Sequence, residues 1–250
     1  MRGILCGRQW GGVLEMPNAL IDILTGKDAK AAYALLLQLE EQSERDPGLY
    51  PLLGDFLAML ESDNSLVRAR GFRLTVAQAL WDSDNVIDSR IDDVLALLRD
   101  PKGTTARQSL QFAYVLLDAK PYLFPYVAEA LESMDLSRYP DGIRPLIADD
   151  ANRLASQADE CRRLFLRPTD WIDWGDEAVL NRAALIGRGS GGVVDLAEAT
   201  FEFVRDEIAH SYDVGCHVPA AKASDVLKTG ASICWGKANL LAALLRANGI

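Results

Sequence analysis

Residues 230–250 read Gly-Ala-Ser-Ile-Cys-Trp-Gly-Lys-Ala-Asn-Leu-Leu-Ala-Ala-Leu-Leu-Arg-Ala-Asn-Gly-Ile. Small residues lead up to Cys234, and a run of strong helix formers follows from Lys237 to Ala247. The Asn-Gly pair after this run is a typical helix stop. The pattern therefore predicts an apolar helix with Cys234 at or just before its first turn.

A cysteine at the start of a helix is a candidate nucleophile. The unpaired backbone N–H groups of the first turn and the helix dipole make this position electropositive. The position favours a thiolate, which is the form that attacks a carbonyl carbon. The alternative is a buried structural cysteine, a common role for a free cysteine.

Three blocks of sequence, in this order, resemble bacterial transglutaminase-like proteins, which share the papain-like cysteine-protease architecture. They are residues 193–213, which look like the helix that opens this fold, residues 223–230, which lead into the nucleophile, and the helix that follows Cys234. The resemblance covers about residues 170–250, a third of the chain. It implies that Cys234 is the catalytic nucleophile, and we expect no cofactor and no metal.

The sequence departs from the family after the nucleophile helix. The family's catalytic histidine and aspartate follow this helix on later strands, and no residue here can be matched to either role. We therefore expect an incomplete transglutaminase-like domain at residues 161–250, largely helical, lacking most of its sheet and inactive as given. The alternative is an active amide hydrolase or acyltransferase that uses a cysteine nucleophile.

The sequence contains two histidines that could act as a base. His210 is predicted to end a helix over residues 195–209, where the helix dipole would stabilise it, with Asp195 as the cap. His217 is predicted to lie in a loop beside Cys216. Neither histidine matches the family's base, and the Cys-His pair lacks two further nearby ligands for a metal.

Residues 17–133 are predicted to be helical and repetitive. Leu24, Leu60 and Leu98 each end an apolar helix before a polar turn, and they recur at intervals of about 37 residues. Further turns between them give two helices per unit. A helix pair cannot bury its apolar face alone, so such pairs stack into a solenoid. The units resemble HEAT-type repeats, and a non-repeating helical bundle is the alternative.

The apolar residues of these predicted helices follow the 3.6-residue period of a buried face. In one set of helices they are Ala32, Leu35, Leu36 and Leu39, then Val67, Phe72, Val76 and Leu80, then Leu110, Ala113, Tyr114 and Leu117. In the partner set they are Leu53, Phe56, Leu57 and Leu60, then Ile91, Val94, Leu95 and Leu98, then Leu123, Val127, Ala130 and Leu131. We expect these residues to form the core.

A short basic row lies in the second predicted unit, at Arg68, Arg70 and Arg73. The last two share a helix face and could clamp an acidic partner. The expected role is surface pairing with nearby acidic residues, which contributes little per pair.

Residues 135–170 are predicted to join two domains. The Tyr-Pro-Asp-Gly sequence at residues 139–142 is a turn signal, and residues 144–166 form one or two helices that cap the solenoid. The domains would then be residues 17–160 and 161–250. The glycine-rich loop at residues 187–192 lacks the Gly-Lys-Ser/Thr ending of a phosphate-binding loop, so we do not expect it to bind a nucleotide.

Composition limits the function classes. The net charge is −10, and residues 17–150 carry most of it, with 22 acidic and 13 basic residues, which argues against a nucleic-acid partner. No run of about 18 apolar residues occurs, so we expect no membrane span. Four cysteines without metal-like spacing, and no secretory signal, favour reduced thiols in the cytoplasm.

Residues 1–16 contain four glycines and no helical or strand period, so we expect a disordered extension before a start at Met16. Taken together, the sequence predicts a scaffold that binds a protein partner through its helical repeats. This scaffold is fused to an incomplete transglutaminase-like domain.

Overall fold

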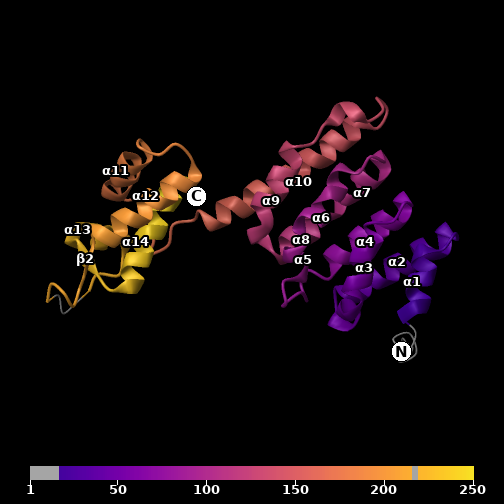
Figure 1. The fold of residues 1–250 in the computed structure, drawn as a ribbon, viewed down its shortest axis with the longest axis horizontal. Helices are drawn as coiled ribbons and strands as arrows, with labels where there is room; N and C mark the ends of the chain where they lie inside the picture. The colour runs from indigo at the N-terminus through magenta and orange to yellow at the C-terminus, as the bar shows by residue number, and fades with distance from the viewer. Residues whose placement is uncertain (1–16, 216–218) are drawn as a thin grey trace, which may run out of the picture. The chain divides into compact units, whose positions relative to one another are not determined.

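The computed structural model describes residues 17–215 and 219–250, and it is mainly helical, as the sequence predicts (Figure 1). The predictions for residues 1–16, Cys216 and His217 lie outside the described residues. The chain divides into two compact units, and the second begins at Arg163. None of the helices in the described part combines the length and apolar character needed to cross a bilayer.

The elements of the first unit are helices and short 3₁₀ turns, with no strand between residues 17 and 133. They are α1 (Pro17–Thr25), α2 (Ala29–Ser43), η1 (Pro47–Leu52), α3 (Leu53–Met59), α4 (Ser65–Ala77), α5 (Val86–Ser89), α6 (Ile91–Ala96), η2 (Leu97–Arg99), α7 (Gly103–Phe112), α8 (Tyr114–Ala119), η3 (Pro121–Leu123), α9 (Phe124–Glu132), η4 (Leu136–Arg138) and α10 (Arg144–Phe165).

Alternate helices of the first unit pack side by side. Helix α2 lies against α4, α4 against α7, and α6 against α9, while α3 pairs with α4 (Figure 1). The three leucine anchors Leu24, Leu60 and Leu98 are buried between these helices. Most of the predicted apolar face residues are buried as well, but Leu80 and Tyr114 are exposed.

The arginine row was predicted to lie at the surface, and for two of its members this is wrong. Arg70 and Arg73 are buried, because α4 is covered on both sides by neighbouring helices. Arg70 donates to the Leu24 carbonyl oxygen at 2.6 Å, and Arg73 makes a bidentate pair with Glu40 at 2.6 and 2.7 Å. The guanidinium groups therefore join α4 to other helices and are not available to clamp a partner.

The third arginine of the row, Arg68, makes a bidentate pair with Asp100 at 2.6 and 3.0 Å. Like the other side-chain hydrogen bonds between helices of this unit, this pair joins residues that are far apart in sequence. Side-chain hydrogen bonds between its helices typically span from 29 residues (Arg90 to Glu61) to 46 residues. These separations are close to the interval between the leucine anchors.

A buried carboxylate, Asp82, collects four donors from three segments of the first unit. It accepts hydrogen bonds from the amides of Val86 and Ile87 and from the Tyr50 hydroxyl, each at 2.9 Å, and from the Lys120 ammonium at 3.0 Å. Burial raises the pKa of Asp82, but these donors outweigh it, so the pKa lies below its usual range. The carboxylate is therefore charged in the folded protein at neutral pH.

The second unit is organised around one helix. Its elements are α11 (Glu177–Gly187), α12 (Val193–Asp206), β1 (Ala209–His210), α13 (Ala223–Thr229), β2 (Ala231–Ser232) and α14 (Cys234–Ala247). Helices α11, α12 and α13 all pack against α14. The core between them includes Val179, Val204, Val226, Leu240 and Leu244.

The region before β1 differs from the prediction in two respects. Helix α12 ends at Asp206, so His210 does not end a helix but lies on β1, which pairs in parallel with β2. The Lys237 ammonium donates to the Ile208 carbonyl oxygen at 2.6 Å and stabilises the chain where it leaves α12. At the other end the cap is Gly192, and Asp195 lies in the first turn.

Candidate functional site

Helix α14 begins at Cys234, directly after β2. The residue before it, Ile233, has extended backbone angles (φ −86°, ψ 176°), and no described side chain caps the first turn. The Cys234 side chain is exposed. The thiol therefore lies at the amino end of a fourteen-residue helix, next to amide groups that no side chain covers.

The start of α14 is held close to β2 by a glycine. A Cβ atom at Gly236 would overlap the hydroxyl oxygen of Ser232 and lie 2.5 Å from the Ala220 carbonyl oxygen. The Ser232 hydroxyl itself donates to that carbonyl at 2.5 Å. Only a residue without a side chain allows this approach, so Gly236 fixes where the first turn, and with it the thiol, is placed.

Lys237 is the basic residue nearest to Cys234 in the sequence, and its ammonium is hydrogen-bonded elsewhere. Lys237 points back to the end of α12, where its ammonium donates to the carbonyl oxygens of Arg205 at 3.2 Å and Ile208 at 2.6 Å. Its charge therefore compensates the carboxyl end of that helix. The amide groups at the start of α14 remain as a source of positive potential at Cys234.

The parallel strands place His210 in the small sheet that leads into the nucleophile helix. In the register of β1 and β2, His210 lies opposite Ser232, two residues before Cys234. Its ring stacks on Tyr212, with centroids 5.6 Å apart and an angle of 18° between the planes. Within residues 17–215 and 219–250, no side chain forms a hydrogen bond with the Cys234 thiol.

The residue after Cys234 belongs to an aromatic pair. The ring of Trp235 meets that of Trp171 edge to face, with centroids 6.3 Å apart, and both residues are about half exposed. The pair therefore presents an exposed apolar surface at the start of α14. Sequence reasoning missed this feature, although the tryptophan directly after the cysteine was a usable signal.

The segment around Trp171 is tied to the start of α13. The Trp171 carbonyl accepts from the Ala223 amide at 2.9 Å, and Asp173 accepts from the Ser224 amide at 3.0 Å and pairs with Lys222 at 3.2 Å. Burial raises the pKa of Asp173, but Ser224 and Lys222 outweigh it, so the pKa lies below its usual range. These contacts hold Trp171 against the nucleophile helix.

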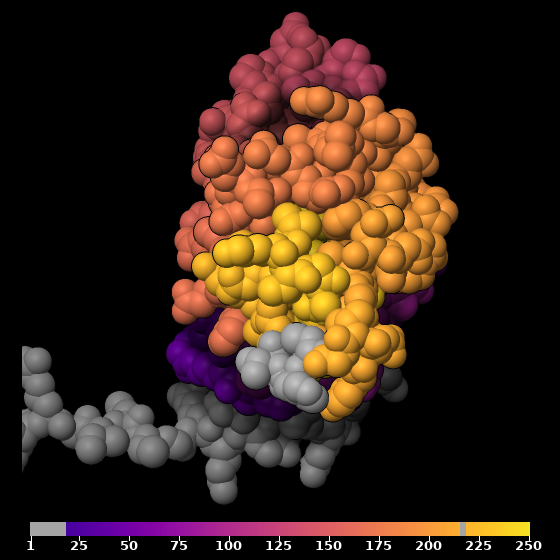
Figure 2. Space-filling model, turned by 90° about the vertical axis from the view of Figure 1, so that its left-hand side faces the viewer, coloured from indigo at the N-terminus to yellow at the C-terminus, as the bar shows by residue number. Residues whose placement is uncertain are grey.

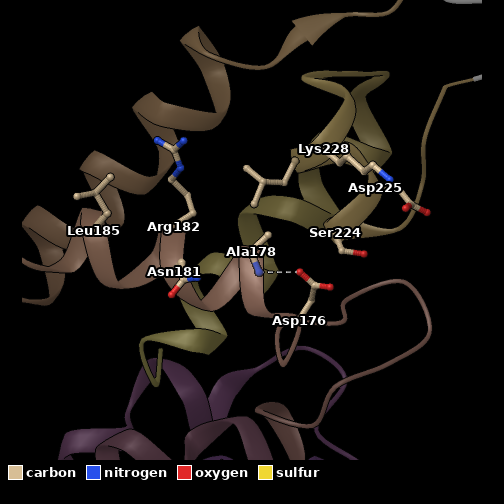
Figure 3. A pocket seen from close by; sticks show the side chains of 9 residues that line it. Asp176, Ala178, Asn181, Arg182, Leu185, Ser224, Asp225 and Lys228 are labelled. Carbon is tan, nitrogen blue, oxygen red and sulfur yellow. Dashed lines mark hydrogen bonds between the residues drawn. The ribbon is translucent and has the colours of Figure 1, made fainter.

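A polar pocket of about 580 Å³ lies between α11 and α13 in the same unit (Figure 3). Asp176, whose carboxylate accepts from the Ala178 amide at 2.9 Å, lies at one side of it, and Arg182 and Lys228 lie at the other. Arg182 is already placed over the Phe203 ring at 4.7 Å. Cys234 does not line this pocket, so the pocket is separate from the thiol.

On the described part of the chain, no group of three or more histidine, cysteine or acidic residues is placed to hold a metal ion. The end of the chain, yellow in Figure 2, forms part of the face that this view shows, although much of α14 is packed against its neighbours. The site is thus an exposed thiol at the start of a helix, followed in the sequence by a partly exposed tryptophan.

Comparison with known families gives a match within the second unit. Residues 183–250 match the model of the transglutaminase-like superfamily, and this range includes α12, α13 and the whole of α14. A transglutaminase-like domain is therefore present in the C-terminal part of the chain, as the sequence indicated. Neither the curated proteins nor the solved structures gave a match.

Proposed function

We propose that the protein is a helical scaffold that binds a partner protein and carries, in its second unit, a reactive thiol with Cys234 as the acyl acceptor. The observation that carries the proposal is the position of Cys234, exposed at the first residue of α14 and inside the transglutaminase-like match. The role of the thiol follows from the chemistry of that class.

The reaction begins when the Cys234 sulfur attacks a carbonyl carbon of an amide or ester. The carbonyl oxygen gains negative charge, which the uncovered amides of the first turn of α14 can stabilise. The C–N or C–O bond then breaks, the leaving group takes a proton, and a thioester remains on the sulfur. Water or an amine would complete the cycle by releasing the acyl group.

Completion of the cycle needs a proton acceptor near the sulfur. In the described residues the thiol has no such partner, and the ring of His210 stacks on Tyr212. The chain on its own therefore takes up an acyl group without turning over rapidly. The runner-up function is an active amide hydrolase or acyltransferase, with His210 or His217 as the base.

The scaffold role rests on the first unit. Its helix pairs are joined at separations close to the 37-residue interval of the leucine anchors, as expected for stacked HEAT-like pairs at residues 17–160. Stacked pairs present extended surfaces on which proteins bind. We expect no nucleic acid among its partners, because the first unit is acidic.

The thiol is tested by alkylation with iodoacetamide at pH 7, with each cysteine followed by peptide mass mapping. Cys234 should react faster than Cys161, which is buried and whose thiol pKa is raised by that burial. With p-nitrophenyl acetate, the chain should release about one equivalent of p-nitrophenol in a burst that Cys234→Ser abolishes. Equal labelling of the two cysteines would show that Cys234 is a structural cysteine. Turnover of an amide that Cys234→Ser stops would establish the runner-up function.

A further inference from the structure

A groove of about 460 Å³ crosses the first unit where α2, α4 and α8 lie side by side. Its walls are mostly apolar and include Leu37 of α2, Leu80 after α4, and Tyr114 of α8. The exposed fractions of these three side chains are 44%, 64% and 46%. The 3.6-residue period predicts that Leu80 and Tyr114 are buried. In the groove they are exposed, whereas most residues of the same predicted faces lie in the core.

Arg73, the cationic residue that lines the groove, already has an acidic partner. Arg73 pairs with Glu40 at 2.6 and 2.7 Å, and its guanidinium lies over the Phe112 ring at 3.7 Å. Both side chains of the ion pair are largely buried. The arginine therefore joins α4 to α2 and to the end of α7, and its charge is already paired with Glu40.

The charge that remains at the groove is negative. Glu44 and Asp118 line it, and both side chains are exposed. Asp118 accepts a hydrogen bond from Gln157 at 2.9 Å, a neutral donor that leaves its charge uncompensated. The pKa of Glu40 is raised, chiefly because Glu40 is buried. The negative charge of the nearby Glu44 raises it further.

We propose that this groove binds a segment of a partner protein in which a large apolar side chain is flanked by lysine or arginine. The apolar side chain would cover Leu37, Leu80 and Tyr114, and the basic side chains would pair with Glu44 and Asp118. The inference rests on the proposed scaffold function and names the chemistry of its partner. Apolar contact supplies most of the affinity, and the acidic rim selects the charge of the segment.

The test starts from random dodecapeptides displayed on phage and selected on the full-length protein. Selected sequences should combine leucine, phenylalanine or tryptophan with neighbouring lysine or arginine. One of them, synthesised with a fluorescent label, is then titrated with variants by anisotropy. We expect Leu80→Asp and Glu44→Lys each to raise the Kd by about tenfold or more.

Two matched substitutions of the same unit serve as controls. Leu66→Asp places the same charge at an exposed leucine outside the groove, and Glu129→Lys makes the same charge reversal at an exposed glutamate outside it. Both should leave the Kd unchanged. All four side chains are exposed, so helical circular dichroism should match that of the parent chain.

Three results would overturn the proposal. Peptides that bind the groove and control variants equally well would leave the scaffold function standing but place the binding surface elsewhere. Failure to select any peptide would count against both the groove and the scaffold function. A dimer, measured by light scattering, that Leu80→Asp dissociates would show that a second copy of the chain occupies the groove.

Discussion

In the first unit, charged side-chain pairs join several helices, alongside neutral hydrogen bonds, whereas in the second unit most side-chain bonds between segments run to a backbone carbonyl. The pairs of the first unit include Arg68–Asp100, Arg73–Glu40 and Arg107–Asp150. In the second unit, Lys237 and Asn239 of α14 donate to carbonyl oxygens of segments that precede it.

The difference matters because a charged pair needs two matched side chains, while a carbonyl is present at every residue. The first unit must therefore supply both members of each pair from different helices, and its stability is distributed over many positions. The second unit can rely on donors from one helix. Substitutions in α14 should then affect the whole second unit, and a lost pair in the first unit should act where that pair lies.

The largest loss of unfolding free energy is expected at the most deeply buried ion pair, Asp82–Lys120. Asp82→Ala leaves the Lys120 ammonium with Asp88 but without its buried partner. It also removes the acceptor of the Val86 and Ile87 amides. The lost half of a buried pair and two amides without an acceptor together cost about 3–5 kcal/mol of unfolding free energy. Urea unfolding combined with hydrogen exchange should show this loss in the first unit only. The control is Asp84→Ala, at an exposed neighbour; an equal loss in both variants would refute the role given to Asp82.

The second-largest effect tests whether the stability of the second unit depends on α14. Gly236→Ala places a Cβ against Ser232 and Ala220, and overpacking of this kind costs about 1–3 kcal/mol. Hydrogen exchange should be accelerated in α11, α12 and α13, because all three pack on α14. The matched control is Gly175→Ala in the same unit, where no atom lies within 4 Å of the added Cβ. If only the first turn of α14 exchanged faster, the second unit would not depend on that helix.

A smaller effect is expected at Lys237. Lys237→Met keeps most of the side-chain length but removes the hydrogen bonds to Arg205 and Ile208, which should cost the second unit about 1 kcal/mol. The rate at which iodoacetamide labels Cys234 should not change, because the ammonium points to α12. A clear drop in that rate would show that Lys237 activates the thiol after all.

The smallest effect is pH-dependent and concerns Asp173. Asp173→Asn should lower the unfolding free energy of the second unit at pH 7 by about 0.5–1 kcal/mol, since the ties to Ser224 and Lys222 weaken. The folded pKa of Asp173 is depressed, so its contribution is present above the unfolded value of about 3.9 and is lost as the pH falls through the folded value. Urea unfolding of the parent protein and of Asp173→Asn should be measured at several pH values. The difference between their unfolding free energies should disappear in acid. A difference that does not vary with pH would mean that the charge of Asp173 contributes nothing.

The helical class and most of the core could be predicted, because the 3.6-residue period records burial locally. Leu36, Phe72 and Val94 are buried as their spacing indicates. The exposure of Leu80 could not be predicted in this way. Its period fits the buried face, but whether a neighbouring helix covers that face is decided by packing between segments distant in sequence.

For the candidate site, too, local features could be predicted from the sequence and contacts between distant segments could not. The start of α14 at Cys234 follows from local helix formers, whereas its surroundings do not. His210 was placed on a helix because its neighbours favour one, yet pairing with β2 places it on a strand. Lys237 lies three residues after Cys234 in the sequence, yet the carbonyl acceptors of its ammonium lie about 30 residues earlier.

The separations between tied residues also set the order in which the chain can fold while it is being made. Each pair between helices of the first unit can form once about 30–45 further residues have been synthesised, since Arg68 needs Asp100 and Arg107 needs Asp150. Folding of that unit can therefore follow synthesis one helix pair at a time. In the second unit α11 can contact α12 and α13 earlier, but all three remain without their common partner until α14 has been translated.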